Sequence, residues 1–86
     1  MRVLVPSPLF AYTADRREVE ATGSTLAEVM ADLDARFPGL RFRIVDEHGA
    51  LREHVRVWVS GTLARTLATP VAPHDEVAIV AALSGG

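Results

Sequence analysis

Residues 77–86 read Val-Ala-Ile-Val-Ala-Ala-Leu-Ser-Gly-Gly. The first seven are all apolar, which predicts a strand over residues 77–83. A strand with almost no polar residues is typical of the centre of a sheet. The three residues that follow have little side chain to bury. We therefore expect one folded domain over residues 1–83 and a flexible tail over residues 84–86.

The composition is that of one globular domain. The chain has 86 residues, of which 49% are hydrophobic, and no cysteine. Disulfides, a cysteine-bound thioester and cysteine-ligated metals are therefore excluded for this chain. All nine basic residues are arginines, they are scattered among eleven acids, and the net charge is −2. Nucleic acids require a basic face, so the charge pattern argues against them as partners.

Neither a targeting segment nor a membrane span is expected. The first ten residues, MRVLVPSPLF, hold one charge and two prolines and lack the continuous apolar stretch of a signal peptide. No apolar run approaches the roughly 20 residues that cross a bilayer. We therefore expect a cytoplasmic protein without a membrane partner.

The first half of the chain predicts a hairpin followed by a helix. Strands are expected over residues 2–6 and 17–21, with a turn at residues 9–15 between them. Thr25 and Glu28 have the spacing of a capping box, and Pro38-Gly39 ends the helix that follows. Its apolar residues recur at helical spacing and form one stripe: Leu26, Val29, Met30, Leu33 and Phe37.

The second half predicts a return to strands. Residues 40–45 fit either a short helical turn or an extended piece. Residues 55–59 alternate between valine and polar or aromatic residues, which indicates a strand, and Ser60-Gly61 is typical of a hairpin turn into a short strand at residues 62–65. The order strand, strand, helix, strand, short strand, strand predicts an α+β domain of the β-grasp (ubiquitin-like) type. Its mixed sheet has four to five strands with one main helix packed across it, and the last strand pairs with the first.

With these elements in register, the chain resembles the MoaD/ThiS family of ubiquitin-like sulfur carriers along nearly its whole length. The resemblance rests on the starting strand, the helix start at Gly23-Ser24-Thr25-Leu26, the valine-rich strand followed by Ser60-Gly61, and residues 79–86 with their Gly-Gly end. Molybdopterin-type members often have prolines just before the tail, where this chain has Ala81 and Ala82. The ending is closer to carriers that serve cysteine or specialised-metabolite synthesis.

The resemblance implies a reaction at the C-terminal carboxylate of Gly86. A ubiquitin-activating-like adenylyltransferase uses ATP to adenylate this carboxylate, and a sulfurtransferase or other sulfur donor converts the adenylate to a thiocarboxylate. The chain is then a protein co-substrate and not an enzyme, and it binds no cofactor of its own. Gly85 keeps the tail slim enough for a narrow channel, while Ser84 and Leu83 extend its reach.

The acceptor of the sulfur stays open. A molybdopterin-synthase large subunit, a cysteine-synthase-like enzyme and an enzyme of a sulfur-containing natural product all fit, and a stable complex with the acceptor is plausible for the family. Transfer RNA thiolation and protein conjugation are further options. Because the sequence closes on Gly-Gly, we expect that no protease is needed to expose the tail.

A second candidate site is a docking face on the sheet. Val55, Val57 and Val59 are expected to face the helix, which places Arg56 and Trp58 on the open face, with Val80 beside Trp58. Exposed aromatics near arginine are favoured at protein interfaces. The alternative function is a non-covalent β-grasp subunit that docks through the Trp58/Val80 face and never reacts. Trp58 also fits a purely structural role in covering the sheet.

Other polar residues do not form a catalytic or metal-binding pattern. His48, His54 and His74 match no metal-ligand spacing and are expected to be solvated. The acidic pairs Asp46-Glu47 and Asp75-Glu76 are interpreted as turn residues.

Overall fold

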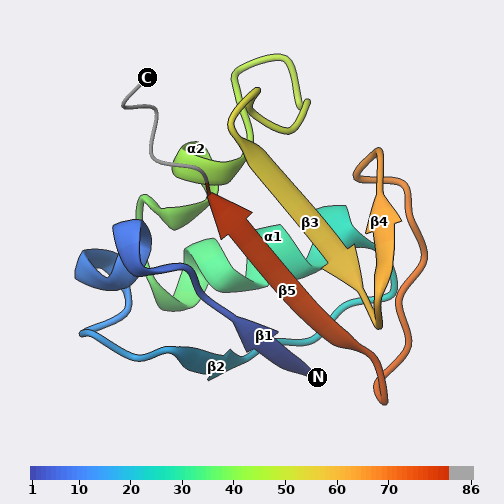
Figure 1. Ribbon diagram of the computed structural model, residues 1–86, viewed down its shortest axis with the longest axis horizontal. Coiled ribbons are helices and arrows are strands. Elements are labelled where there is room, and N and C mark those ends of the chain that lie inside the picture. Colours follow the sequence, from blue (N-terminus) through green and yellow to red (C-terminus); the bar gives the residue numbers. More distant parts are fainter. Residues whose placement is uncertain (82–86) are drawn as a thin grey trace.

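The computed structural model describes residues 1–81, and the tail residues lie outside the described part. One mixed sheet has the strand order β2-β1-β5-β3-β4, with β5 at its centre, parallel to β1 and antiparallel to β3. Helix α1 crosses one face of this sheet (Figure 1). The β-grasp prediction is confirmed. The elements are β1 (Arg2–Leu4), the 3-10 helix η1 (Ser7–Tyr12), β2 (Glu18–Glu20), α1 (Leu26–Arg36), α2 (Leu40–Ile44), β3 (Val55–Val59), β4 (Thr62–Ala64) and β5 (Glu76–Ala81).

The start of α1 is capped much as the sequence predicts. The hydroxyl of Thr25 accepts a hydrogen bond from the Glu28 N–H at 3.3 Å. The Glu28 carboxylate accepts a hydrogen bond from the N–H of Ser24 at 2.8 Å, and Ser24 lies one residue before the cap itself. Together these bonds satisfy N–H groups that the first helical turn leaves unpaired.

The apolar stripe of α1 forms the centre of the core. Leu26, Val29, Met30 and Leu33 are fully buried. Phe37, expected as the last member of the stripe, is instead the C-cap of the helix and only half-buried. Burial of such a stripe against a sheet, at about 25 cal/mol per Å² of apolar surface, is the main source of stability for a helix of this length.

Prolines shorten the predicted first strand. The expected strand over residues 2–6 ends at Leu4, because Pro6 has no N–H to donate and begins η1 as its N-cap. Residues 9–15 were expected as a plain turn, but η1 occupies much of this segment. Strand β2 is correspondingly limited to Glu18–Glu20, and β4 ends at Ala64, one residue earlier than predicted.

The ambiguous segment after Gly39 is a helix. Asp34 caps α2 from the end of α1, since its Oδ1 accepts from the N–H groups of Gly39 at 3.1 Å and Arg41 at 3.2 Å. Leu40 and Ile44 are buried on its inner side. This cap comes from the preceding helix, which is why the local pattern alone left the choice open. Neither α-helix among residues 1–81 is long and apolar enough to span a membrane.

Candidate docking surface on the open face of the sheet

Four apolar residues form one row across the open face of the sheet. Leu4 of β1 lies opposite Ala78 of β5, Ala78 lies opposite Trp58 of β3, and Trp58 lies opposite Leu63 of β4. The row is continuous because adjacent strands in a sheet are only about 4.8 Å apart. Of these side chains, Trp58 is the most exposed, at 37%.

The inward residues confirm which face is open. Val55 and Val57 are buried, as predicted, and so are Val77 and Ile79 of β5. Their neighbours along the strands therefore point away from α1. Val59, also expected to face the helix, is only half-buried and packs at the edge of the core. Arg56 and Trp58 are on the open face, as the alternation of β3 predicts.

Val80 lies on the same face, although not directly beside Trp58 as expected. It is 48% exposed, and its direct cross-strand partner is Arg56. Trp58 faces Ala78, so Val80 and Trp58 are diagonal neighbours, a distance that a large aromatic can still bridge. The register between β3 and β5 is set by long-range pairing, and the sequence pattern could not supply it.

The C-terminal segment begins at one end of this face. Ala81, the last described residue, pairs with Val55 at the start of β3. Leu83, Ser84, Gly85 and Gly86, together with the domain boundary after residue 83, lie outside the described residues.

Charged residues flank the apolar row on the side of β1 and β2. The Arg2 guanidinium pairs with the carboxylates of Glu76 and, at 3.7 Å, Glu18. The hydrogen bond and the charge of Glu76 raise the pKa of Arg2 above its usual value. Glu76 was expected in a turn, but it opens β5, where this bond joins it to β1.

The remaining acids that the sequence singles out are turn residues. Asp75 accepts hydrogen bonds from the Ala72 N–H and the Ser60 hydroxyl, both at 2.8 Å, and these bonds lower its pKa. Asp46 accepts from the N–H groups of Ala50 and His48, which lower its pKa in the same way. Hydrogen bonds to the ionised form favour that form, so both carboxylates hold loops together.

The histidines are exposed. The side chains of His48 and His74 are 81% and 86% exposed, and His54 is also at the surface. Within residues 1–81, no group of three or more potential ligand residues is arranged to hold a metal ion.

Comparison with known proteins agrees with this architecture. The model of the ThiS family matches residues 3–86. The sulfur carrier protein CysO of Mycobacterium tuberculosis is 35% identical over 89 aligned positions, which cover 98% of this chain and 96% of that protein. Among solved structures, the BexX/CysO complex of Amycolatopsis orientalis contains a chain that matches with a TM-score of 0.90 at 30% identity, covering 99% of this chain and 98% of that one. The crystal structure of M. tuberculosis CysO matches with a TM-score of 0.89 at 32% identity, over 95% and 98% of the two chains. On these similarities and its β-grasp fold, the chain belongs to the ThiS family.

Proposed function

We propose that the chain is a sulfur carrier whose C-terminal Gly86 carries sulfur as a thiocarboxylate. The observation that carries this proposal is the similarity to a named sulfur carrier over 98% of the chain, together with the Gly-Gly end. The chain acts as a co-substrate, and its folded part serves to present the tail to enzymes.

The proposed chemistry begins with activation of the carboxylate. One oxygen of the Gly86 carboxylate attacks the α-phosphorus of ATP, and pyrophosphate leaves. A hydrosulfide equivalent from the sulfur donor then attacks the carbonyl carbon of the adenylate, and AMP leaves with the bonding electrons. The proton of the new thioacid passes to solvent, which leaves an ionised thiocarboxylate as a nucleophile for the acceptor enzyme.

The folded part supports this proposal through its open face. The apolar row contains Trp58, which is 37% exposed, and Val80, which is 48% exposed, lies beside the row on the same face. Both are suited to contact a partner. Strand β5, which contributes to this face, is described as far as Ala81, three residues before the predicted tail over residues 84–86. One enzyme can therefore hold the sheet and receive the tail at the same time. The acceptor belongs to cysteine, molybdopterin or specialised-metabolite biosynthesis, and the alanines before the tail favour the first and last of these.

The non-covalent interaction subunit is the second candidate, because the same face would serve it equally well. The two functions differ in whether Gly86 reacts. The test is to incubate the chain with ATP, the adenylyltransferase of the source genome and a sulfur donor, and then measure the intact mass. A gain equal to one oxygen replaced by sulfur, located at Gly86, supports the carrier. An unchanged mass with an enzyme shown to be active refutes it and favours the interaction subunit.

A further inference from the structure

Two shallow hollows meet at Arg56, next to the Val55–Ala81 end of the sheet. The smaller has a volume of about 220 Å³ and is lined by Glu53, His54, Arg56 and Val80. The larger has a volume of about 370 Å³ and is lined by Arg56 and Arg65. Its remaining lining residues are Leu51, Arg52, Glu53, Val55, Leu63 and Ala64, so it combines apolar walls with three arginines and one carboxylate.

The Arg56 side chain is held in place by the backbone. Its Nη1 donates to the carbonyl of Glu53 at 2.8 Å and to the carbonyl of Val55 at 3.1 Å. These bonds use the two protons of Nη1 and leave the donors on Nε and Nη2 for another acceptor. A guanidinium that is already oriented loses less conformational entropy when it binds a partner group.

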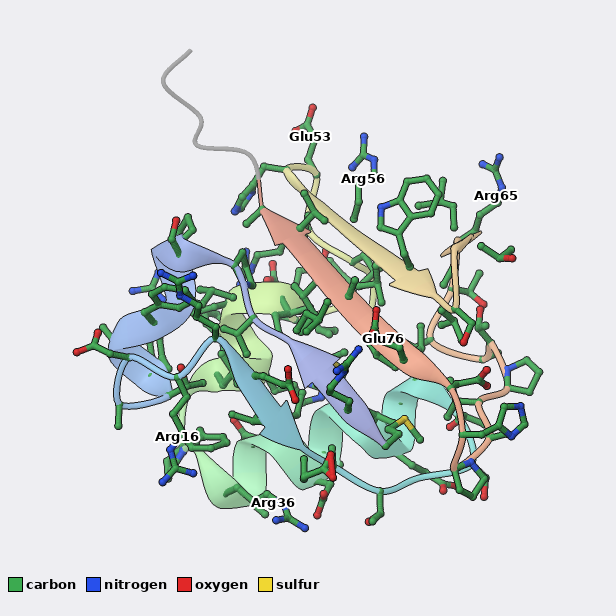
Figure 2. All side chains as sticks on the ribbon, turned by 60° about the horizontal axis from the view of Figure 1, so that its bottom comes forward. Arg16, Arg36, Glu53, Arg56, Arg65 and Glu76 are labelled. Atoms are coloured by element: carbon green, nitrogen blue, oxygen red, sulfur yellow. The ribbon has the colours of Figure 1, made fainter. Side chains whose placement is uncertain are left out.

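Arg56 and Arg65 differ in their surroundings from three other arginines of the chain: Arg2, Arg36 and Arg52. Arg2 and Arg36 are paired with carboxylates of the chain itself, and Arg52 lies over the Phe42 ring at 4.6 Å. Within residues 1–81, no carboxylate forms an ion pair with Arg56 or Arg65. Figure 2 shows both side chains projecting outward on one side of the molecule. They therefore present positive charge on the docking surface.

We propose that the larger hollow receives a carboxylate side chain of the activating adenylyltransferase, which is bound between Arg56 and Arg65. This inference rests on the proposed function. A guanidinium binds a carboxylate through two parallel hydrogen bonds, and the walls formed by Leu51 and Leu63 suit the methylene groups of an aspartate or glutamate. A polyanion fits less well, because the Glu53 carboxylate in the same hollow and the net charge of −2 repel several negative charges more strongly than the single charge of one carboxylate.

This contact would orient the carrier on the enzyme. The opposite side of the open face presents Glu18, Glu20 and Glu76, partly balanced by Arg2. A carboxylate of the enzyme is attracted at the Arg56 side and repelled at the β2 side. Electrostatic complementarity of this kind selects one docking orientation, and here it selects the one that places the Val55–Ala81 end of the sheet near the bound enzyme.

The experiment measures adenylation of the full chain by the adenylyltransferase of the source genome, as a function of carrier concentration. The test variant carries Arg56→Glu and Arg65→Glu. Its matched control carries Arg16→Glu and Arg17→Glu, which change the net charge by the same amount at exposed positions; Arg16 lies far from Arg56 and Arg65 in Figure 2. We expect the test variant to raise KM for the carrier about tenfold or more with kcat nearly unchanged, and the control to stay within about twofold. Arg56→Glu also removes the hydrogen bonds from Arg56 to the backbone carbonyls of Glu53 and Val55. Arg65→Glu alone is therefore measured as a variant that keeps these hydrogen bonds.

The outcomes separate this inference from the proposed function. If wild type is adenylated and the Arg56/Arg65 variant behaves like the Arg16/Arg17 control, the carboxylate contact is refuted while the carrier function stands. The variant Arg56→Lys keeps the positive charge but lacks the forked guanidinium. If its KM for the carrier is still higher than that of wild type, the two-bond contact with a carboxylate is supported. If an active adenylyltransferase does not adenylate the wild-type chain, the proposed carrier function is refuted, and the carboxylate contact that rests on it is refuted as well. If the chain's own tail occupies the hollow, deleting Gly86 would alter the NMR signals of the Arg56 and Arg65 side chains, and that result would overturn the inference.

Discussion

Val80 and Arg56 are direct cross-strand partners, two residues along from the pair formed by Ala78 and Trp58. The register therefore places an exposed branched side chain against an arginine whose guanidinium is anchored on the backbone. The apolar row and the charged hollows are parts of one surface, and Arg56 and Val80 join them next to the Val55–Ala81 end of the sheet.

Replacing Trp58 with alanine tests the apolar row. We expect KM for the carrier in the adenylation reaction to rise about tenfold, since large exposed aromatics at an interface centre often contribute most of its binding energy. The free energy of unfolding should fall by only about 1 kcal/mol, the upper range for a cross-strand pair. Phe42→Ala is the matched control, because Phe42 is 58% exposed but belongs to α2. Equal effects of the two substitutions on KM would contradict a docking role for Trp58.

Deleting Gly86 tests the reacting group. Sulfur loading should be abolished, whereas the midpoint of thermal unfolding should stay within about 1 °C, because the last buried core residue among residues 1–81 is Ile79. Gly86→Ala keeps the terminal carboxylate and adds only a Cβ. It therefore separates the effect of losing the reacting residue from the effect of a side chain that hinders entry into a narrow channel. Intact-mass measurement follows loading in each variant, and full loading of the deletion variant would refute the carrier function.

Gly23 should tolerate no side chain. A Cβ built there would lie 2.8 Å from the Val29 nitrogen and 2.9 Å from the Glu28 Cβ, inside the first turn of α1. We expect Gly23→Ala to lower the free energy of unfolding by about 2 kcal/mol through this overlap. At Gly49 the φ angle is +79° but no atom lies within 4 Å of a Cβ. Gly49→Ala should therefore cost only about 1 kcal/mol of backbone strain. Denaturant unfolding measures both, and equal losses would argue against steric overlap at Gly23.

Asp75 should make stability depend on pH in the acidic range. The Ala72 N–H and the Ser60 hydroxyl lower the pKa of Asp75 in the folded state below the unfolded value of about 3.9. The stabilisation is thus fully present above the unfolded pKa and is lost as pH falls through the folded pKa. We expect Asp75→Asn to flatten the fall in thermal midpoint on acidification and to lower the midpoint at pH 7.

Ser60→Ala is the partial variant for this test. It removes one of the two donors to Asp75 and should weaken the pH dependence without abolishing it. Thermal unfolding followed by circular dichroism from neutral to acidic pH measures all three proteins. A pH profile for Asp75→Asn that matches wild type would show that Asp75 contributes nothing to acid sensitivity.

Local sequence patterns were enough to predict the elements that are determined by residues close together in the chain. The stripe from Leu26 to Leu33, the cap at Thr25 and the alternation over Val55–Val59 each follow from the geometry of one element. The apolar run at the C-terminal end likewise indicated a central strand, because a strand paired on both sides has few polar residues.

Pairing between distant segments needed the folded structure. The parallel match of Val3 with Val77, the row from Leu4 to Leu63, and the Val80–Arg56 pair are all set by hydrogen bonds between strands far apart in the chain. A shift of register by two residues would keep the same faces but change every neighbour, so alternation alone cannot select among such registers. The same holds for the two hollows at Arg56: the larger exists only where β3, β4 and the loop before β3 meet, and the smaller also needs Val80 of β5.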